Sequence, residues 1–164
     1  MLELAKTQPF ARTLVNSGRL SVPATLHGST LNTPDAESFA GRMVPGSAAA
    51  DAPIMRPDGS PTWLLRELGD GFTALVMAGD ESDALVHSLE GVAANGIPLK
   101  VVRLASGGNA GNGLMDGEGL AAQRYDLRPG TVYLFRPDQH VCARWRKPTA
   151  AQVGAAIKRA LTLA

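Results

Sequence analysis

Apolar residues follow a strand–turn–strand pattern late in the chain. Segments 131–136 and 141–146 are rich in β-branched and aromatic residues, which predicts two strands. Between them, residues 136–139 read Arg-Pro-Asp-Gln, with proline at the second turn position, as in a type I turn. The pattern therefore predicts a β-hairpin over 130–146.

A terminal helix is predicted directly after this hairpin. Thr149 stands three residues before Gln152, which is the spacing of a capping box. The apolar residues that follow share one helical face: Val153, Ile157, Ala160 and Leu161.

A strand–helix–strand unit is predicted upstream. Residues 72–77 form an almost continuous apolar run, which is typical of a strand covered on both faces. Asp80 and Ser82 offer N-caps for a helix that ends at 95–96, and residues 99–104 predict the next strand. The apolar face of that helix is formed by Leu85, Leu89, Val92 and Ala93. Such a unit implies parallel pairing of its two strands.

The element order from residue 72 predicts the fold class. A glycine-rich loop at 106–117 precedes a short helix around 119–125, and the hairpin and terminal helix follow. The resulting order is β-α-β-α-β-β-α. That order predicts an α/β, thioredoxin-like fold, a mixed four-stranded sheet with an antiparallel hairpin at one side.

The N-terminal part has weaker patterns. Residues 1–16 predict a short helix interrupted at Pro9, and residues 62–68 a short helical or extended piece. Residues 17–61 are dominated by Gly, Ser, Pro, Thr and Asp without a period, which is unusual inside a compact domain. We therefore divide the chain into an irregular arm or connection at 1–45 and a thioredoxin-like domain at 46–164. An ordinary extended loop is the alternative for the arm.

The apolar residues of the arm have no partner within their own segment; they are Leu2, Leu4, Phe10, Leu14 and Val15. They need a surface, which a second copy of the chain could provide. A homo-oligomer, in the simplest case a dimer, is expected.

Composition narrows the function classes. Sixteen basic and fifteen acidic residues leave a net charge of +1 without a basic block, which argues against a nucleic-acid partner. One cysteine excludes an internal disulfide and suits a reducing compartment. No apolar run approaches the ~20 residues that span a bilayer, and no signal-peptide pattern is seen. A cytoplasmic location is therefore expected.

Thiol chemistry is not expected. A redox thioredoxin carries Cys-x-x-Cys where its first strand meets its first helix. Here residues 78–82 read Ala-Gly-Asp-Glu-Ser. Cys142 lies in the hairpin without a second thiol, so we interpret it as a buried structural cysteine.

The other polar residues do not form a recognisable site. His27, His87 and His140 lack metal-ligand spacing. We expect a solvated pair between His87 and Glu90, and a role for His140 in orienting the turn. Arg136, Arg144 and Arg146 could pair with Asp138 or with a partner domain, and pairing at the surface is the default expectation.

Two further candidates are weak. The glycine-rich loop Gly107–Gly113 matches neither the dinucleotide fingerprint nor the P-loop, and a surface loop is expected. Ser47 and Ser60 lie in turns without the setting of a nucleophile elbow. We predict no catalytic, cofactor-binding or metal-binding residue in this chain.

Several short motifs carry a family resemblance. Residues 130–146 resemble the closing segment of class A flavin-dependent aromatic hydroxylases, those related to phenol hydroxylase and 3-(3-hydroxyphenyl)propionate hydroxylase. Upstream, residues 15–21, 31–35 and 45–53 resemble the passage into the C-terminal domain of the same family. The resemblance implies a thioredoxin-like domain without redox cysteines, beside a flavin-binding domain.

The resemblance does not extend to catalytic residues. The dinucleotide fingerprint is absent, and Gly69-Asp70 and Gly79-Asp80 are isolated dipeptides. FAD and NAD(P)H are thus implied for a parent monooxygenase, and this chain is expected to be its non-catalytic C-terminal region. The alternative is a stand-alone, redox-inactive binding module that uses the loop Gly107–Gly113. A thiol oxidoreductase fails on the cysteine count.

Overall fold

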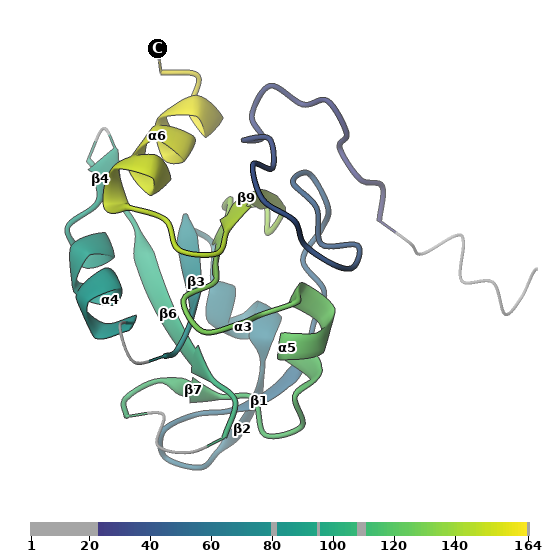
Figure 1. Ribbon diagram of the computed structural model, residues 1–164, viewed down its shortest axis with the longest axis vertical. Coiled ribbons are helices and arrows are strands. Elements are labelled where there is room, and N and C mark those ends of the chain that lie inside the picture. Colours follow the sequence, from purple (N-terminus) through teal and green to yellow (C-terminus); the bar gives the residue numbers. More distant parts are fainter. Residues whose placement is uncertain (1–22, 80–81, 95, 108–110, 164) are drawn as a thin grey trace, which may run out of the picture.

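The fold is built on one long mixed sheet (Figure 1). The computed structural model describes residues 23–79, 82–94, 96–107 and 111–163. The sheet has the order β2-β1-β7-β6-β3-β8-β9. Its strands are β1 Pro53–Met55, β2 Pro61–Trp63, β3 Thr73–Met77, β6 Lys100–Ala105, β7 Leu114–Met115, β8 Val132–Phe135 and β9 Val141–Trp145. A separate two-stranded sheet pairs β4 Ala93–Ala94 with β5 Ile97–Pro98.

The four central strands confirm the predicted thioredoxin-like arrangement. β3 pairs in parallel with β6 and antiparallel with β8, and β8 pairs antiparallel with β9. Every residue of β3 is buried. Leu75 and Met77 point into one hydrophobic cluster, whereas Ala74 and Val76 point into another. Burial on both faces explains why this strand is a continuous apolar run rather than an alternating one.

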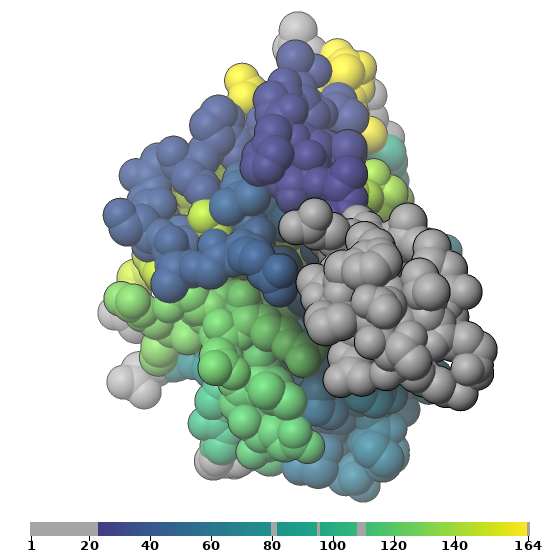
Figure 2. All heavy atoms as spheres, turned by 90° about the vertical axis from the view of Figure 1, so that its right-hand side faces the viewer, coloured from purple at the N-terminus to yellow at the C-terminus, as the bar shows by residue number. Residues whose placement is uncertain are grey.

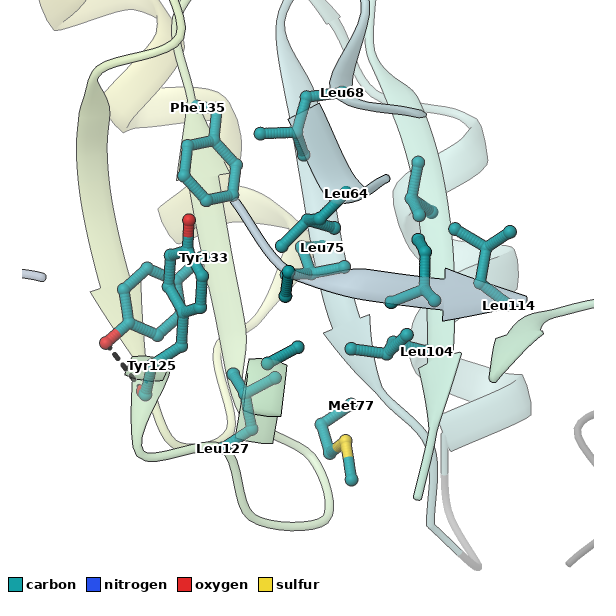
Figure 3. Close-up of a cluster of buried hydrophobic side chains, with 14 of the residues drawn as sticks. Leu64, Leu68, Leu75, Met77, Leu104, Leu114, Tyr125, Leu127, Tyr133 and Phe135 are labelled. Atoms are coloured by element: carbon teal, nitrogen blue, oxygen red, sulfur yellow. Dashed lines mark hydrogen bonds between the residues drawn. The ribbon is translucent and has the colours of Figure 1, made fainter. Parts of the chain in front are cut away.

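Helices cover both faces of the sheet. On one face α4 Ser82–Glu90 and α6 Ala150–Ala160 pack over β3, β6 and β9. On the other, α3 Leu64–Leu68 and α5 Leu120–Tyr125 enclose the larger cluster. Figure 3 shows this cluster, in which Tyr125 and Tyr133 meet edge to face at 5.1 Å between ring centroids. The Tyr133 hydroxyl donates to the carbonyl of Tyr125 at 2.8 Å, so the polar end of this buried ring is satisfied.

The start of α6 agrees with the sequence prediction, whereas the end of α4 does not. The capping box of α6 is present: the side chain of Thr149 accepts from the backbone N–H of Gln152, and the Gln152 side chain accepts from that of Thr149. The helix α4 is shorter than predicted, because Ala93 already belongs to β4. Gly91 weakens helix continuation there, and Gly96, at φ +75°, allows the tight turn between β4 and β5.

Five strands were not predicted from the sequence: β1, β2, β4, β5 and β7. β1, β2 and β7 are two or three residues long, and they extend the four-stranded sheet to seven strands. β1 lies within the irregular stretch 17–61, where prolines and glycines obscure any alternation, and β2 begins at the end of that stretch. Strands this short have too few positions for a period of two to be recognised.

The outer edge of β9 is covered by residues 26–50, which we call the edge segment. Gly46 N–H donates to the carbonyl of Val141 at 2.8 Å, and Val141 N–H donates to that of Ser47 at 2.9 Å. Ala48 forms a β-bridge with His140, and Thr33 N–H donates to the carbonyl of Cys142 at 2.9 Å. In the space-filling view the purple and blue edge segment lies over the yellow-green hairpin (Figure 2). The backbone groups at this edge are therefore paired instead of open to another chain.

The backbone conformation of the edge segment requires glycine at position 46. Its φ is +93°, and a Cβ added there would lie 2.5 Å from the carbonyl oxygen of Leu26. The N–H of Leu26 donates to the Gly46 carbonyl at 2.8 Å, so this close approach is part of the hydrogen-bonded path. Only glycine combines the positive φ with the missing side chain.

Gly46→Ala should therefore destabilise the fold more than the same substitution at a positive-φ glycine that has no close neighbours. The matched control is Gly59→Ala, at φ +81° with nothing within 4 Å of the added Cβ. We expect a loss of about 1 kcal/mol for Gly59→Ala, and a further ~1–3 kcal/mol for Gly46→Ala from overpacking. Urea unfolding of both variants measures the difference, and equal losses would contradict the role of the close approach.

Candidate functional site

The junction of β3 and α4 is the position where a redox thioredoxin keeps its thiols. A pocket of about 410 Å³ opens here, between Gly79 and Leu85 on one side and residues 129–130 and 147–148 on the other. A Cβ on Gly79 would lie 2.7 Å from the Cβ of Pro129, so glycine allows the two loops to approach. The Ser82 hydroxyl donates to the Gly79 carbonyl at 2.8 Å. Among the described lining residues, Lys147 carries the one titratable side chain.

Both residues that the sequence suggested as N-caps of α4 lie at this junction. Ser82 is the first residue of α4, so it is not the N-cap that the sequence suggested. Asp80, the other N-cap candidate, lies outside the described residues. The pocket is therefore a shallow hollow of backbone and apolar groups with one lysine, and a thiol is excluded by the sequence of the junction.

Cys142 is a structural cysteine, as predicted. It lies in β9 with no exposed surface, and its sulfur is 3.6 Å from the carbonyl oxygen of Leu31 and 3.8 Å from that of Ala156. Burial raises the pKa of the thiol to about 11, which outweighs the opposing effect of the Arg136 charge. The thiolate, which is the reactive form, is therefore scarce at neutral pH.

His87 and His140 have the surroundings that we predicted for them. His87 and Glu90 form an exposed pair on α4, with 3.7 Å between Nδ1 and Oε2. The His140 backbone N–H donates to Asp138 Oδ1 at 3.1 Å and its ring lies 3.2 Å from the Asp138 carbonyl oxygen, so it holds the hairpin turn. Within the described parts of the chain, no group of three or more His, Cys, Asp or Glu residues could hold a metal ion. No helix of these parts is long and apolar enough to cross a membrane.

Two of the three hairpin arginines, Arg136 and Arg144, are buried, which corrects the expectation of surface pairing for them. Arg144 is 5% exposed, and its guanidinium binds the Asp35 carboxylate through two parallel hydrogen bonds of 3.0 and 2.7 Å. A further hydrogen bond of 3.0 Å reaches the carbonyl of Met43. The sequence could not show this, because Asp35 is 109 positions away in the chain.

Arg136 fastens the same segment at a second point. It is also 5% exposed; it pairs with Asp138, as the sequence suggested, and its Nη1 lies 3.3 Å from Asn32 Oδ1. Burial alone would raise the pKa of Asp138, but hydrogen bonds from Arg136 and from the His140 backbone hold it below its usual value. A β-turn is present where one was predicted, because the Gln139 N–H donates to the Arg136 carbonyl at 2.8 Å.

Arg146 forms the third attachment. Its guanidinium stacks over the Phe39 ring, 3.7 Å from the centroid, and pairs with Asp126. Its backbone N–H donates to Glu37 Oε2 at 2.7 Å. The pKa of Asp126 lies below its usual value, mainly because its carboxylate accepts a hydrogen bond from the Ala40 N–H. The hydrogen bond from Arg146 lowers this pKa further. The three arginines thus hold the edge segment along one side of the hairpin.

The two candidate serines form hydrogen bonds within the fold. Ser47 is buried, and its hydroxyl donates to the Val44 carbonyl at 2.6 Å. Ser60 lies in the turn between β1 and β2, where its N–H donates to Asp58 Oδ1. The loop Gly107–Gly113 falls partly on residues 108–110, which lie outside the described chain.

Asp35→Asn should destabilise the fold strongly, because it leaves the buried Arg144 charge without its carboxylate. We expect a loss on the order of 2–4 kcal/mol in the free energy of unfolding. The matched control is Asp83→Asn, whose carboxylate pairs with Arg103 but is 78% exposed; there we expect less than ~1 kcal/mol. Denaturant unfolding measures both, and two equally small losses would show that the Asp35 pair does not fasten the edge segment.

Cys142 should resist modification in the native chain. With the pKa near 11, roughly one thiol in a thousand is ionised at pH 8, and burial blocks access as well. An aromatic disulfide reagent at pH 8 should react at least about 100-fold more slowly than with the chain unfolded in urea. Equal rates in the two conditions would contradict a buried thiol.

Comparison with known proteins finds similar solved structures, but no matching family model or curated protein. Aklavinone-11 hydroxylase, in a ternary complex with FAD and aklavinone, is 25% identical with a TM-score of 0.64. The match covers 82% of this chain and 25% of the hydroxylase. The flavin-dependent monooxygenase PieE, in complex with FAD and substrate, is 18% identical over 99% of this chain and 32% of its own, with a TM-score of 0.62.

A thioredoxin-like protein matches over its whole length. PrxQ from Xylella fastidiosa, in a cysteine-to-serine variant, is 12% identical with a TM-score of 0.56, over 73% of this chain and 98% of PrxQ. This confirms the predicted fold class. The chain spans about a quarter to a third of the flavin-dependent enzymes. It is thus similar, with a thioredoxin-like fold, to one segment of the class A FAD-dependent monooxygenases, as its motifs indicated.

Proposed function

We propose that this chain is the C-terminal domain of an FAD-dependent aromatic-compound monooxygenase, in which it has a structural role and carries no catalytic group. The observation that carries the proposal is the similarity to aklavinone-11 hydroxylase, at 25% identity over 82% of the chain but only 25% of that enzyme. FAD and NAD(P)H would be bound by the remaining, larger portion. The partner of this chain is then the flavin-binding domain.

The edge segment supports this assignment. The motifs of the family resemblance are far apart in sequence, yet Asp35 pairs with Arg144, Asn32 contacts Arg136, and Gly46 bonds to Val141. They therefore form one structural unit in which residues 26–45 are fastened to the hairpin. If residues 1–45 connect the flavin-binding domain to residues 46–164, the last part of that connection is fixed on the surface of the domain.

The contacts of the polar residues support a non-catalytic role. Catalytic acids, bases and nucleophiles need access to a substrate and a suitably poised pKa. Here Arg136 and Arg144 are buried in ion pairs, the thiol of Cys142 is enclosed, and the Ser47 hydroxyl is bonded to the backbone. These contacts hold the fold together.

The second candidate is a stand-alone, redox-inactive binding module. The pocket of about 410 Å³ at the β3–α4 junction favours it, as does the match to almost the whole of PrxQ. The ligand would then bind between Gly79 and residues 129–130 rather than at the loop Gly107–Gly113.

The two candidates predict different results for the purified chain and its reading frame. For the domain of a flavoenzyme, the chain alone should be colourless and should not quench FAD fluorescence. The reading frame directly upstream should encode a flavin-binding portion, and the two parts should copurify with FAD when coexpressed. A yellow isolated chain, or an upstream frame unrelated to flavoenzymes, would contradict the first candidate.

A further inference from the structure

The glycine-rich loop ends in an asparagine followed by a glycine. Asn112 and Gly113 lie in the turn that leads into β7, and the Asn112 side chain is exposed. Neither residue forms a hydrogen bond in the described part of the chain. In an Asn-Gly pair the backbone nitrogen of glycine can approach the side-chain amide closely, because glycine has no side chain in the way. Both reacting groups are therefore available here.

Asn32, the other asparagine within the described ranges, is protected in each of these respects. It is buried, its Nδ2 donates to the Leu26 carbonyl at 3.0 Å, and its Oδ1 lies 3.3 Å from Nη1 of Arg136. The next residue, Thr33, is β-branched, and its N–H donates to the Cys142 carbonyl at 2.9 Å. The side-chain amide and the following nitrogen are thus both held in place.

A glycine in the next position is not sufficient by itself. Gly59 follows the exposed Asp58 in the turn between β1 and β2, but its N–H donates to the Arg56 carbonyl at 2.9 Å. The Asp58 carboxylate accepts a hydrogen bond from the Ser60 N–H at 2.8 Å. Asn112 and the glycine after it lack both kinds of hydrogen bond, and this difference distinguishes the two turns.

We propose that Asn112 is a modification site, at which the side-chain amide is lost by spontaneous deamidation. The Gly113 nitrogen attacks Cγ of Asn112, the amide nitrogen leaves as ammonia with the Gly113 proton, and a cyclic imide forms. Water then opens the imide. Attack of water at Cγ yields aspartate, whereas attack at the main-chain carbonyl yields isoaspartate, whose backbone runs through Cγ. The reaction consumes water and releases ammonia, with no change of oxidation state, and it is independent of the proposed function.

Isoaspartate at this position would disturb the start of β7. It lengthens the backbone by a methylene group just before β7, where the buried Leu114 pairs with Leu104 of β6. β7 is two residues long and joins β6 to β1, through the pair of Met115 and Met55 (Figure 1). So short a strand has few hydrogen bonds with which to hold its register. The modification should therefore loosen the attachment of β1 and β2 to the rest of the sheet.

Peptide mapping by tandem mass spectrometry tests the proposal on the 164-residue chain, incubated in its native state at mildly alkaline pH. Asn112 should be converted to a mixture of aspartate and isoaspartate. Its conversion should be at least about 10-fold faster than that of Asn32, which corresponds to ~1.4 kcal/mol in activation free energy. Fragment ions between positions 109 and 112 assign the site. A native Asn112 that stays intact, or that is converted no faster than Asn32, would overturn the proposal.

Hydrogen exchange tests the effect on β7. The Asp116 N–H donates to the Ala105 carbonyl at 2.8 Å, and incubation should make its exchange at least about 10-fold faster. The matched control is Asn112→Gln, which must form a larger ring and keeps every other asparagine, including Asn95. Its exchange should not change on incubation. Faster exchange in both incubated chains, or in neither, would contradict the effect on β7.

A second variant separates the longer backbone from the added charge. Freshly purified Asn112→Asp carries the new carboxylate but keeps the normal backbone. Its Asp116 N–H should exchange at the rate of the unmodified chain before incubation. Exchange as fast as in the incubated chain would contradict the role of the longer backbone.

Discussion

The ion pair between Arg144 and Asp35 is the contact on which the arrangement of the chain depends. It joins β9 to a segment that would otherwise be a long irregular connection, and the guanidinium that it neutralises is buried. A guanidinium held in this way needs its carboxylate, because an unpaired buried charge is strongly unfavourable. The edge segment is thereby fixed over β9, and its backbone completes the hydrogen bonding of the sheet edge.

This arrangement explains how a thioredoxin-like fold persists here without the Cys-x-x-Cys motif. The two hydrophobic clusters on the faces of the sheet, with the edge segment along β9, account for the packing of its core. Nothing in that packing needs a thiol at the β3–α4 junction, where Gly79 lies against Pro129. The cysteine that is present, Cys142, has become part of the packing between β9 and α6. This packing is compatible with the structural role that we propose.

The proposed structural role makes the surface of the domain more informative than its pockets. Its sheet is seven strands long, while α4 and α6 cover only the central part, and Met55 on β1 and Trp63 on β2 are exposed. The edge segment closes the opposite end of the sheet at β9. The edge segment therefore covers one end of the sheet, whereas the other end exposes Met55 and Trp63.

The sequence by itself determined the central fold, because the apolar run at 72–77, the hairpin turn and the capping box at Thr149 are local signals. It also determined that the chain cannot form an internal disulfide, since it contains one cysteine. Only the tertiary structure decided what the arginines do: Asp35 and Arg144, or Asn32 and Arg136, lie more than 100 positions apart. It also decided the short strands β1, β2 and β7, which form through pairing with neighbours. Contacts between distant residues have no local periodicity, and for that reason the anchoring of the edge segment and the uncovered sheet face could not be predicted.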